Sequence, residues 1–164
     1  MYPAKVLLLL GFWSSAAAAV TLPLLSSAAP TAYEILQSYN FPIGLLPKGA
    51  TSYSLDPTTG NFSVNFDGDC SFSIQNSYQL RYHRTISGRI SSNKLRDLRG
   101  ISVKVLLFWV SIVEVDRIGA NLEFSVGIAG ADFPVDNFDE SPQCGCGMNC
   151  GKEETARVRL RGSF

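Results

Sequence analysis

The chain has 164 residues, enough for one domain, and its composition of 46% hydrophobic and 17% charged residues excludes a disordered polymer. Its 14 basic and 14 acidic residues give a formal net charge of zero, so bulk charge indicates no polyanionic partner. No recognised nucleic-acid-binding motif accompanies the basic residues, and we expect no nucleic-acid partner.

Residues 1–29 have the layout of a secretory signal peptide. Lys5 precedes an apolar run at residues 6–13, and small residues follow at 16–19. We expect cleavage between residues 19 and 29 and a secreted protein of the extracellular space or cell wall. Later apolar runs are far shorter than the roughly 20 residues that a spanning helix needs, so we expect no transmembrane segment after cleavage.

A short helix is predicted next. Thr31 and Glu34 have the spacing of a capping box, in which each side chain satisfies a free backbone N–H at the helix start. Pro42 denies the next turn a donor and ends the helix. The loop at residues 41–50 contains two prolines and two glycines, which indicates an ordered loop laid on an apolar surface.

Alternating polar and apolar residues then predict antiparallel strands from residue 51 to residue 90, separated by the turn sequences DPTTG and DGD. Residues 91–100 are polar and indicate a turn or one helical turn, with Leu95 and Leu98 directed inward. Residues 122–128 alternate again and form a return strand, in which the glycines indicate a bulge or bend.

The segment at residues 101–115, ISVKVLLFWVSIVEV, is the most apolar strand and the expected centre of the fold. One side would face the core, and the other is apolar only in its middle, where a helix, a second sheet or a bound apolar ligand would cover it. The predicted fold class is mainly β (α+β), a curved antiparallel sheet or partly closed β-barrel with a short N-terminal helix. It would form a single domain over residues 30–151, followed by a disordered tail at 152–164.

Four cysteines in an exported chain predict disulfides. Cys70 lies far upstream of Cys144, Cys146 and Cys150, so we expect it to join one of these three while the other two pair locally. Three connectivities remain open. A metal centre is the weaker interpretation because the CGCGMNC cluster offers three thiols without a fourth ligand, and we expect no metal and no cofactor.

No catalytic constellation is evident in the sequence. There is no G-x-S-x-G motif, and the single histidine, His83, lies beside Arg81 and Arg84 on the polar side of its strand, which favours a surface position. Asn61 begins an N-x-S glycosylation sequon that would face solvent in an exported protein.

Several long strings resemble a known plant family, the domain-of-unknown-function 538 proteins, over residues 33–150. The resemblance implies a curved, barrel-like antiparallel sheet with a helix, likened to the lipid-binding domains of bactericidal/permeability-increasing proteins, and a link to stress responses. Proposed chlorophyll or ester hydrolysis in the family comes with no agreed catalytic residues, so none is transferred. The matching strings are YEILQSYNFPIGLLPKG, SYSLDPTTGNFSV, CSFSIQNSYQLRY, ISGRISSNKLRDLRGISVKVLLFWVSIVEV, LEFSVGIAGADFPVDNF and SPQCGCGMNC.

Binding of a lipid or another amphiphile is the first function that we expect. A cell-wall or defence interaction protein without a small ligand, contacting an anionic surface, is the alternative, and an ester hydrolase using His83 is the third. The predicted ligand-binding residues are an apolar wall with two cations for an anionic head: Leu36, Leu45, Leu46, Leu106, Phe108, Val110 and Ile112, with Arg81 and Arg84.

Overall fold

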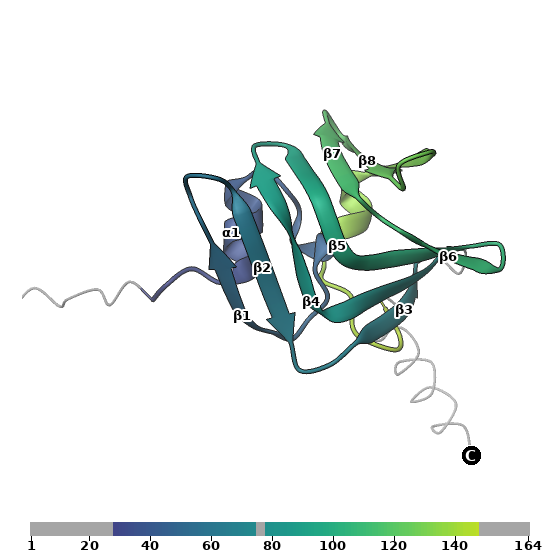
Figure 1. Cartoon of the computed structure of the whole chain (residues 1–164), viewed down its shortest axis with the longest axis horizontal. Coiled ribbons are helices and arrows are strands. Elements are labelled where there is room, and N and C mark those ends of the chain that lie inside the picture. Colours follow the sequence, from purple (N-terminus) through teal and green to yellow (C-terminus); the bar gives the residue numbers. More distant parts are fainter. Residues whose placement is uncertain (1–27, 75–77, 148–164) are drawn as a thin grey trace, which may run out of the picture.

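The structure is a computed structural model that describes residues 28–74 and 78–147 (Figure 1). Most of the predicted signal peptide, Cys150 and the predicted tail lie outside these residues. The described chain is mainly β, as predicted: one short helix precedes a nine-stranded antiparallel sheet that is not closed, since β1 and β9 are its ends.

The elements follow one another in this order along the chain: α1 (Ala32–Ser38), η1 (Ile43–Leu45), β1 (Ala50–Leu55), β2 (Asn61–Phe66), β3 (Cys70–Ile74), β4 (Tyr78–Ser91), β5 (Lys94–Val105), β6 (Phe108–Ser111), β7 (Glu114–Ile118), β8 (Asn121–Ser125), β9 (Gly130–Pro134) and η2 (Val135–Phe138), where η marks a 3-10 helix.

The predicted capping box is confirmed at the start of α1. The Thr31 hydroxyl accepts from the Glu34 N–H at 3.2 Å, and the Glu34 carboxylate accepts from the Thr31 N–H at 2.7 Å. The helix ends at Ser38, before Pro42. Asn40 takes a positive φ of 67°, a conformation that commonly terminates helices. Leu36 of α1 packs with Val64 and the hydrophobic core over one face of the sheet. No helix in the described ranges is long and apolar enough to cross a membrane.

Strands β4 and β5 form a long spine whose two ends have different neighbours. One end of β4 pairs with β3 and the other with β2. One end of β5 pairs with β6 and the other with β7, which continues into β8 and β9. The sheet therefore has two parts that share the spine: β3-β4-β5-β6 and β1-β2-β4-β5-β7-β8-β9.

A break in the β4–β5 ladder separates these two parts. Its register shifts between Tyr82 and Ser87, and Gly100 lies opposite the shift with φ of 89°. A Cβ on Gly100 would lie 2.4 Å from the Thr85 carbonyl oxygen, so both the φ and the close approach require glycine. Such bulges bend a sheet, and here the bend turns β3-β4-β5-β6 toward β8 and β9 (Figure 1).

The expectation of one continuous strand over residues 101–115 is wrong. Strand β5 ends at Val105, a two-residue loop of Leu106 and Leu107 reverses the chain into β6, and a second break separates β6 from β7. The alternating pattern does not reveal the reversal because both loop residues are leucines rather than the glycine or asparagine that mark such turns. The polar turn expected at residues 91–100 is shorter, because β5 already begins at Lys94.

Candidate functional site

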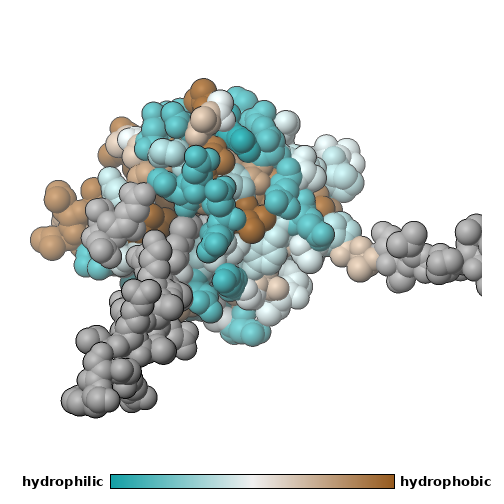
Figure 2. All heavy atoms as spheres, turned by 180° about the vertical axis from the view of Figure 1, so that it is seen from behind, coloured by the Kyte–Doolittle hydropathy of each residue, from teal (hydrophilic) through white to brown (hydrophobic). Residues whose placement is uncertain are grey.

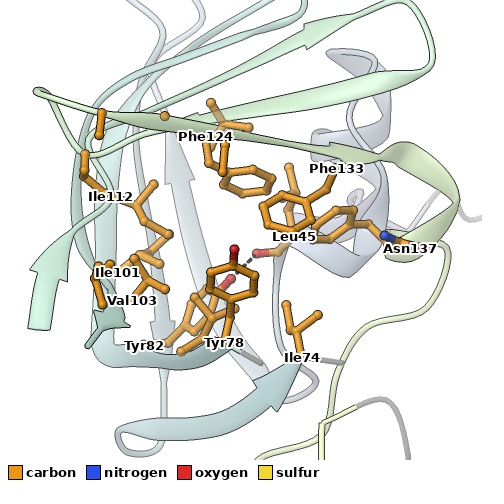
Figure 3. Close-up of a pocket in the computed structure, with 18 residues that line it drawn as sticks. Leu45, Ile74, Tyr78, Tyr82, Ile101, Val103, Ile112, Phe124, Phe133 and Asn137 are labelled. Carbon is orange, nitrogen blue, oxygen red and sulfur yellow. Dashed lines mark hydrogen bonds between the residues drawn. The ribbon is translucent and has the colours of Figure 1, made fainter. Parts of the chain in front are cut away.

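An apolar cavity of about 280 Å³ lies between the two parts of the bent sheet (Figure 3). One wall comes from β3, β4 and β5, and the opposite wall comes from β8, β9 and η2. The first wall follows directly from strand alternation, because Leu80 and Tyr82 point inward opposite their register partners Val103 and Ile101.

Tyr82 forms the buried floor of the cavity. Its ring stacks on Phe72, with 5.6 Å between ring centroids, and its hydroxyl donates to the Leu45 carbonyl oxygen at 3.1 Å. Burial raises the pKa of the Tyr82 phenol above its usual value, so the phenol is neutral at physiological pH. Tyr82 therefore contributes a flat apolar surface, with its one polar group already bonded.

Aromatic rings join the two walls at one side. Phe133 of β9 meets Tyr78 of β4 edge to face at 5.5 Å between centroids, and Phe124 of β8 lies 5.7 Å from Phe133. Strands β4 and β9 do not pair with each other, so these ring contacts connect two strands that share no backbone ladder.

The cavity offers few polar groups to a ligand. None of the described residues that line it is charged, and apart from Tyr82 the polar side chains are the Tyr78 hydroxyl and the Asn137 amide, which lies at one end (Figure 3). Tyr78 and Val105 are 38% and 45% exposed, so the cavity reaches solvent on their side. This arrangement suits an apolar group with a polar end at the opening.

Of the predicted ligand-binding residues, Leu45 and Ile112 line this cavity. Leu36 of α1 and Leu46 of the following loop are buried in the core, beside a much smaller cavity of about 40 Å³. The remaining apolar residues are elsewhere on the β5–β6 hairpin: Val110 is half-buried, and Leu106 and Phe108 project into solvent.

The two predicted cations are not brought to the cavity. Arg81 lies on the opposite side of β4 from Leu80 and Tyr82, and its guanidinium carbon is 4.1 Å from the centroid of the Trp109 ring. Arg84 is exposed and donates to the Asp67 carbonyl oxygen at 2.8 Å.

Sequence reasoning missed the far wall of the cavity. Phe124 carries the alternating signal of its strand, but Phe133 lies in β9, a strand that the pattern did not predict. The sequence DFPVDN around it contains two aspartates and a proline. These residues interrupt the alternation of polar and apolar residues that would have predicted a short strand followed by a 3-10 helix.

His83 has the surface position that its neighbours indicate. Its Nδ1 lies 3.3 Å from the Asp69 carboxylate, and both side chains are more than half exposed. The Arg84 backbone N–H donates to Asp69 at 2.8 Å and holds the pKa of that carboxyl below its usual value. Across residues 28–74 and 78–147, no three His, Cys, Asp or Glu side chains are grouped to hold a metal ion.

A disulfide joins Cys70 at the start of β3 to Cys144, which agrees with the predicted link to the C-terminal cysteines. Cys146 is not free either, and Cys150 lies outside the described residues. Asn61 is exposed at the start of β2, and its glycosylation stays a prediction.

Comparison with known proteins gives a family. Residues 32–139 match the family described as "Protein of unknown function, DUF538". The uncharacterized protein At5g01610 of Arabidopsis thaliana is 30% identical over 95 residues, which are 58% of this chain and 55% of that protein. The chain thus spans about half the length of this relative. Because the family match covers well over half of the sequence, the protein belongs to the DUF538 family of unknown function.

Proposed function

We propose that this protein binds a lipid or another amphiphile and holds its apolar part in the cavity between the two sheet parts. The cavity itself is the observation that carries the proposal. Protein interiors pack densely, and an apolar cavity that opens to solvent leaves its hydrophobic lining in contact with water, which is unfavourable. A cavity of about 280 Å³ with an uncharged lining therefore supports a binding site for an apolar group.

The volume limits what can enter. An apolar cavity of about 150 Å³ is enough for benzene, so this cavity accommodates on the order of ten carbon atoms, such as part of an acyl chain or a ring system. The lining has no charged residue to compensate a buried carboxylate, so a charged head would remain at the opening. Tyr78 and Asn137 are the groups available to hydrogen bond with a neutral polar end.

A location outside the cytosol is part of the same proposal. The Cys70–Cys144 disulfide supports it, because such bonds persist in the oxidising environment of exported proteins. The layout of residues 1–29 is the other support.

Substitution of Val103 by phenylalanine tests the cavity. Val103 points into the cavity, so the larger ring would occupy it and reduce uptake of a fluorescent fatty acid at least about tenfold. The thermal midpoint should stay the same or rise because a void is filled. Fluorescence titration of the purified protein in vesicle-free buffer measures the uptake.

Ile118→Phe is the control. Ile118 is 62% exposed at the end of β7 and does not line the cavity, so the variant carries an added aromatic ring outside the site. Its uptake should stay within about threefold of the unaltered protein. Equal loss in both variants, or no uptake by the unaltered protein across a broad lipid panel, would contradict binding in this cavity and favour an interaction protein without a small ligand.

A further inference from the structure

The tip of the β5–β6 hairpin is the most exposed apolar cluster among the described residues. Leu106, Leu107 and Phe108 are 88%, 83% and 73% exposed, and they are flanked by Val105 at 45% and Trp109 at 36%. Figure 2, which views the molecule from behind, shows hydrophobic atoms projecting at the left, and this side corresponds to the right of Figure 1, where the hairpin ends. Isolated exposed apolar residues are ordinary, whereas a contiguous exposed cluster indicates an interaction surface.

The local backbone does not explain these leucines. The loop has two residues, and Leu106 takes a φ of 56° in it. Glycine, asparagine and aspartate are the residues that favour this conformation, and a branched apolar side chain is strained in it. Leu106 is therefore unfavourable both for the turn and for hydration, a combination that indicates an interaction surface.

The charges behind the tip are all of one sign. The strand segments that support it, residues 70–74, 78–83, 101–105 and 108–111, contain Arg81 and Lys104 but no aspartate or glutamate. Lys104 is the register partner of Trp109, and the Arg81 guanidinium lies over the Trp109 ring, so both cations share its side of the sheet. A projecting apolar tip followed by a tryptophan and then by cations matches the depth profile of an anionic membrane surface.

We propose that the β5–β6 hairpin inserts into the surface of a bilayer that contains acidic phospholipid. Leu106, Leu107 and Phe108 enter the acyl region, Trp109 lies at the interface, and Lys104 and Arg81 contact the lipid headgroups. Since Val105 lines the cavity, this orientation brings the cavity opening to the membrane. The proposal goes beyond amphiphile binding and holds whether or not the cavity takes a ligand.

A second copy of the chain fits this surface less well. A stable dimer buries about 1,200 Å² or more in total, which a two-residue hairpin tip with its flanking residues does not offer. A symmetric pair would also bring the two sets of Arg81 and Lys104 side chains together without an acidic partner on either tip. A bilayer presents both an apolar interior and negative headgroups to the same hairpin.

The test measures partition of the full chain into vesicles by co-sedimentation, with zwitterionic lipid alone or with about one-third acidic phospholipid. The double variant Leu106→Asn with Leu107→Ser replaces the two most exposed apolar side chains of the tip with polar ones. Asparagine at position 106 also relieves the backbone strain that leucine has at a positive φ. Partition of the double variant into acidic vesicles should fall at least about tenfold while its thermal midpoint stays the same or rises. Lys104→Gln should reduce the preference for acidic over zwitterionic vesicles.

Ile118→Asn is the matched control. Ile118 is 62% exposed at the end of β7. It follows Arg117, whose backbone N–H donates to the Asn93 carbonyl oxygen, just before the end of β5 that is remote from the tip. Partition of this variant should stay within about twofold of the unaltered chain, because it loses an exposed apolar side chain remote from the tip.

Tryptophan fluorescence gives a second measurement. In a Trp13→Phe background, Trp109 is the remaining tryptophan, and its emission maximum should shift to the blue when acidic vesicles are added.

Equal partition of the double variant and the unaltered chain overturns the proposal, since the attachment then lies elsewhere in the protein. The proposal is also overturned if neither chain binds vesicles and sedimentation velocity shows a dimer of the unaltered chain that the double variant does not form. Uptake of the fluorescent fatty acid without vesicles reports on the cavity alone, so failure of the cavity function and failure of membrane attachment are distinguishable.

Discussion

At the scale of single residues, sequence reasoning located part of the cavity wall. Leu45 and Ile112 were predicted as ligand contacts and line the cavity: Leu45 lies in the ordered loop after α1, and Ile112 is buried in the break between β6 and β7. The position of Arg81 on the outer side also follows from strand alternation once Tyr82 is placed inside. Phe133 could not be found this way because its role comes from ring contacts with Tyr78 and Phe124.

Gly100 gives a prediction at this scale. Gly100→Ala should lower the free energy of unfolding by at least about 2 kcal/mol, because the methyl group adds a clash with the Thr85 carbonyl oxygen to the strain of a positive φ. Gly49→Ala is the matched control, since Gly49 has a similar φ of 101° with open space around it. Urea unfolding of both variants measures the difference, and equal losses would show that the close approach to Thr85 contributes nothing.

At the scale of elements, the β7-β8-β9 wall of the cavity depends on a short junction with the spine. Strands β5 and β7 pair over only two residues of each strand. Arg96 of β5 reinforces this junction by donating to both carboxylate oxygens of Asp116 of β7, at 2.5 and 2.8 Å. The hydrogen bonds from Arg96 hold the pKa of Asp116 below its usual value, and the same pair raises the pKa of Arg96.

This ion pair predicts a dependence of stability on acid. Because the folded-state pKa of Asp116 is lowered, its contribution is present above the unfolded-state pKa and is lost as the pH falls through the folded-state value. Asp116→Asn should reduce stability at neutral pH by about 1 kcal/mol, allowing for partial exposure, and should weaken the loss of stability below about pH 4.

Thermal unfolding as a function of pH measures this effect. Asp97→Asn serves as the control, because its partner Arg89 and Asp97 itself are both more than half exposed and such pairs contribute little. An acid-dependent loss in Asp116→Asn as steep as in the unaltered protein would refute the assignment to this pair.

At the scale of the whole molecule, the Cys70–Cys144 disulfide connects β3 to the segment that follows η2. The two cysteines are 74 residues apart in sequence, so the bond closes a long loop in the unfolded chain. Joint replacement of Cys70 and Cys144 by alanine should lower the free energy of unfolding by about 2–4 kcal/mol. Denaturant unfolding without reductant measures it, and a variant as stable as the original would show that the bond does not constrain the unfolded chain.

The sequence by itself determined the class of fold, the capped N-terminal helix, most of the alternating strands and the link from Cys70 to the C-terminal cysteines. The first three depend on residues close together in the chain, whose periodicity reports which side of the local backbone is apolar. The cysteine link follows instead from the number and spacing of the cysteines. Only the tertiary structure decided that residues 101–115 reverse at Leu106, that the sheet bends at Gly100, and that β3, β4 and β5 face β8 and β9 across a cavity. The bend and the unfilled volume depend on contacts between residues far apart in sequence, which periodicity does not encode. The reversal is local, but its two leucines do not carry the residue signal of a turn.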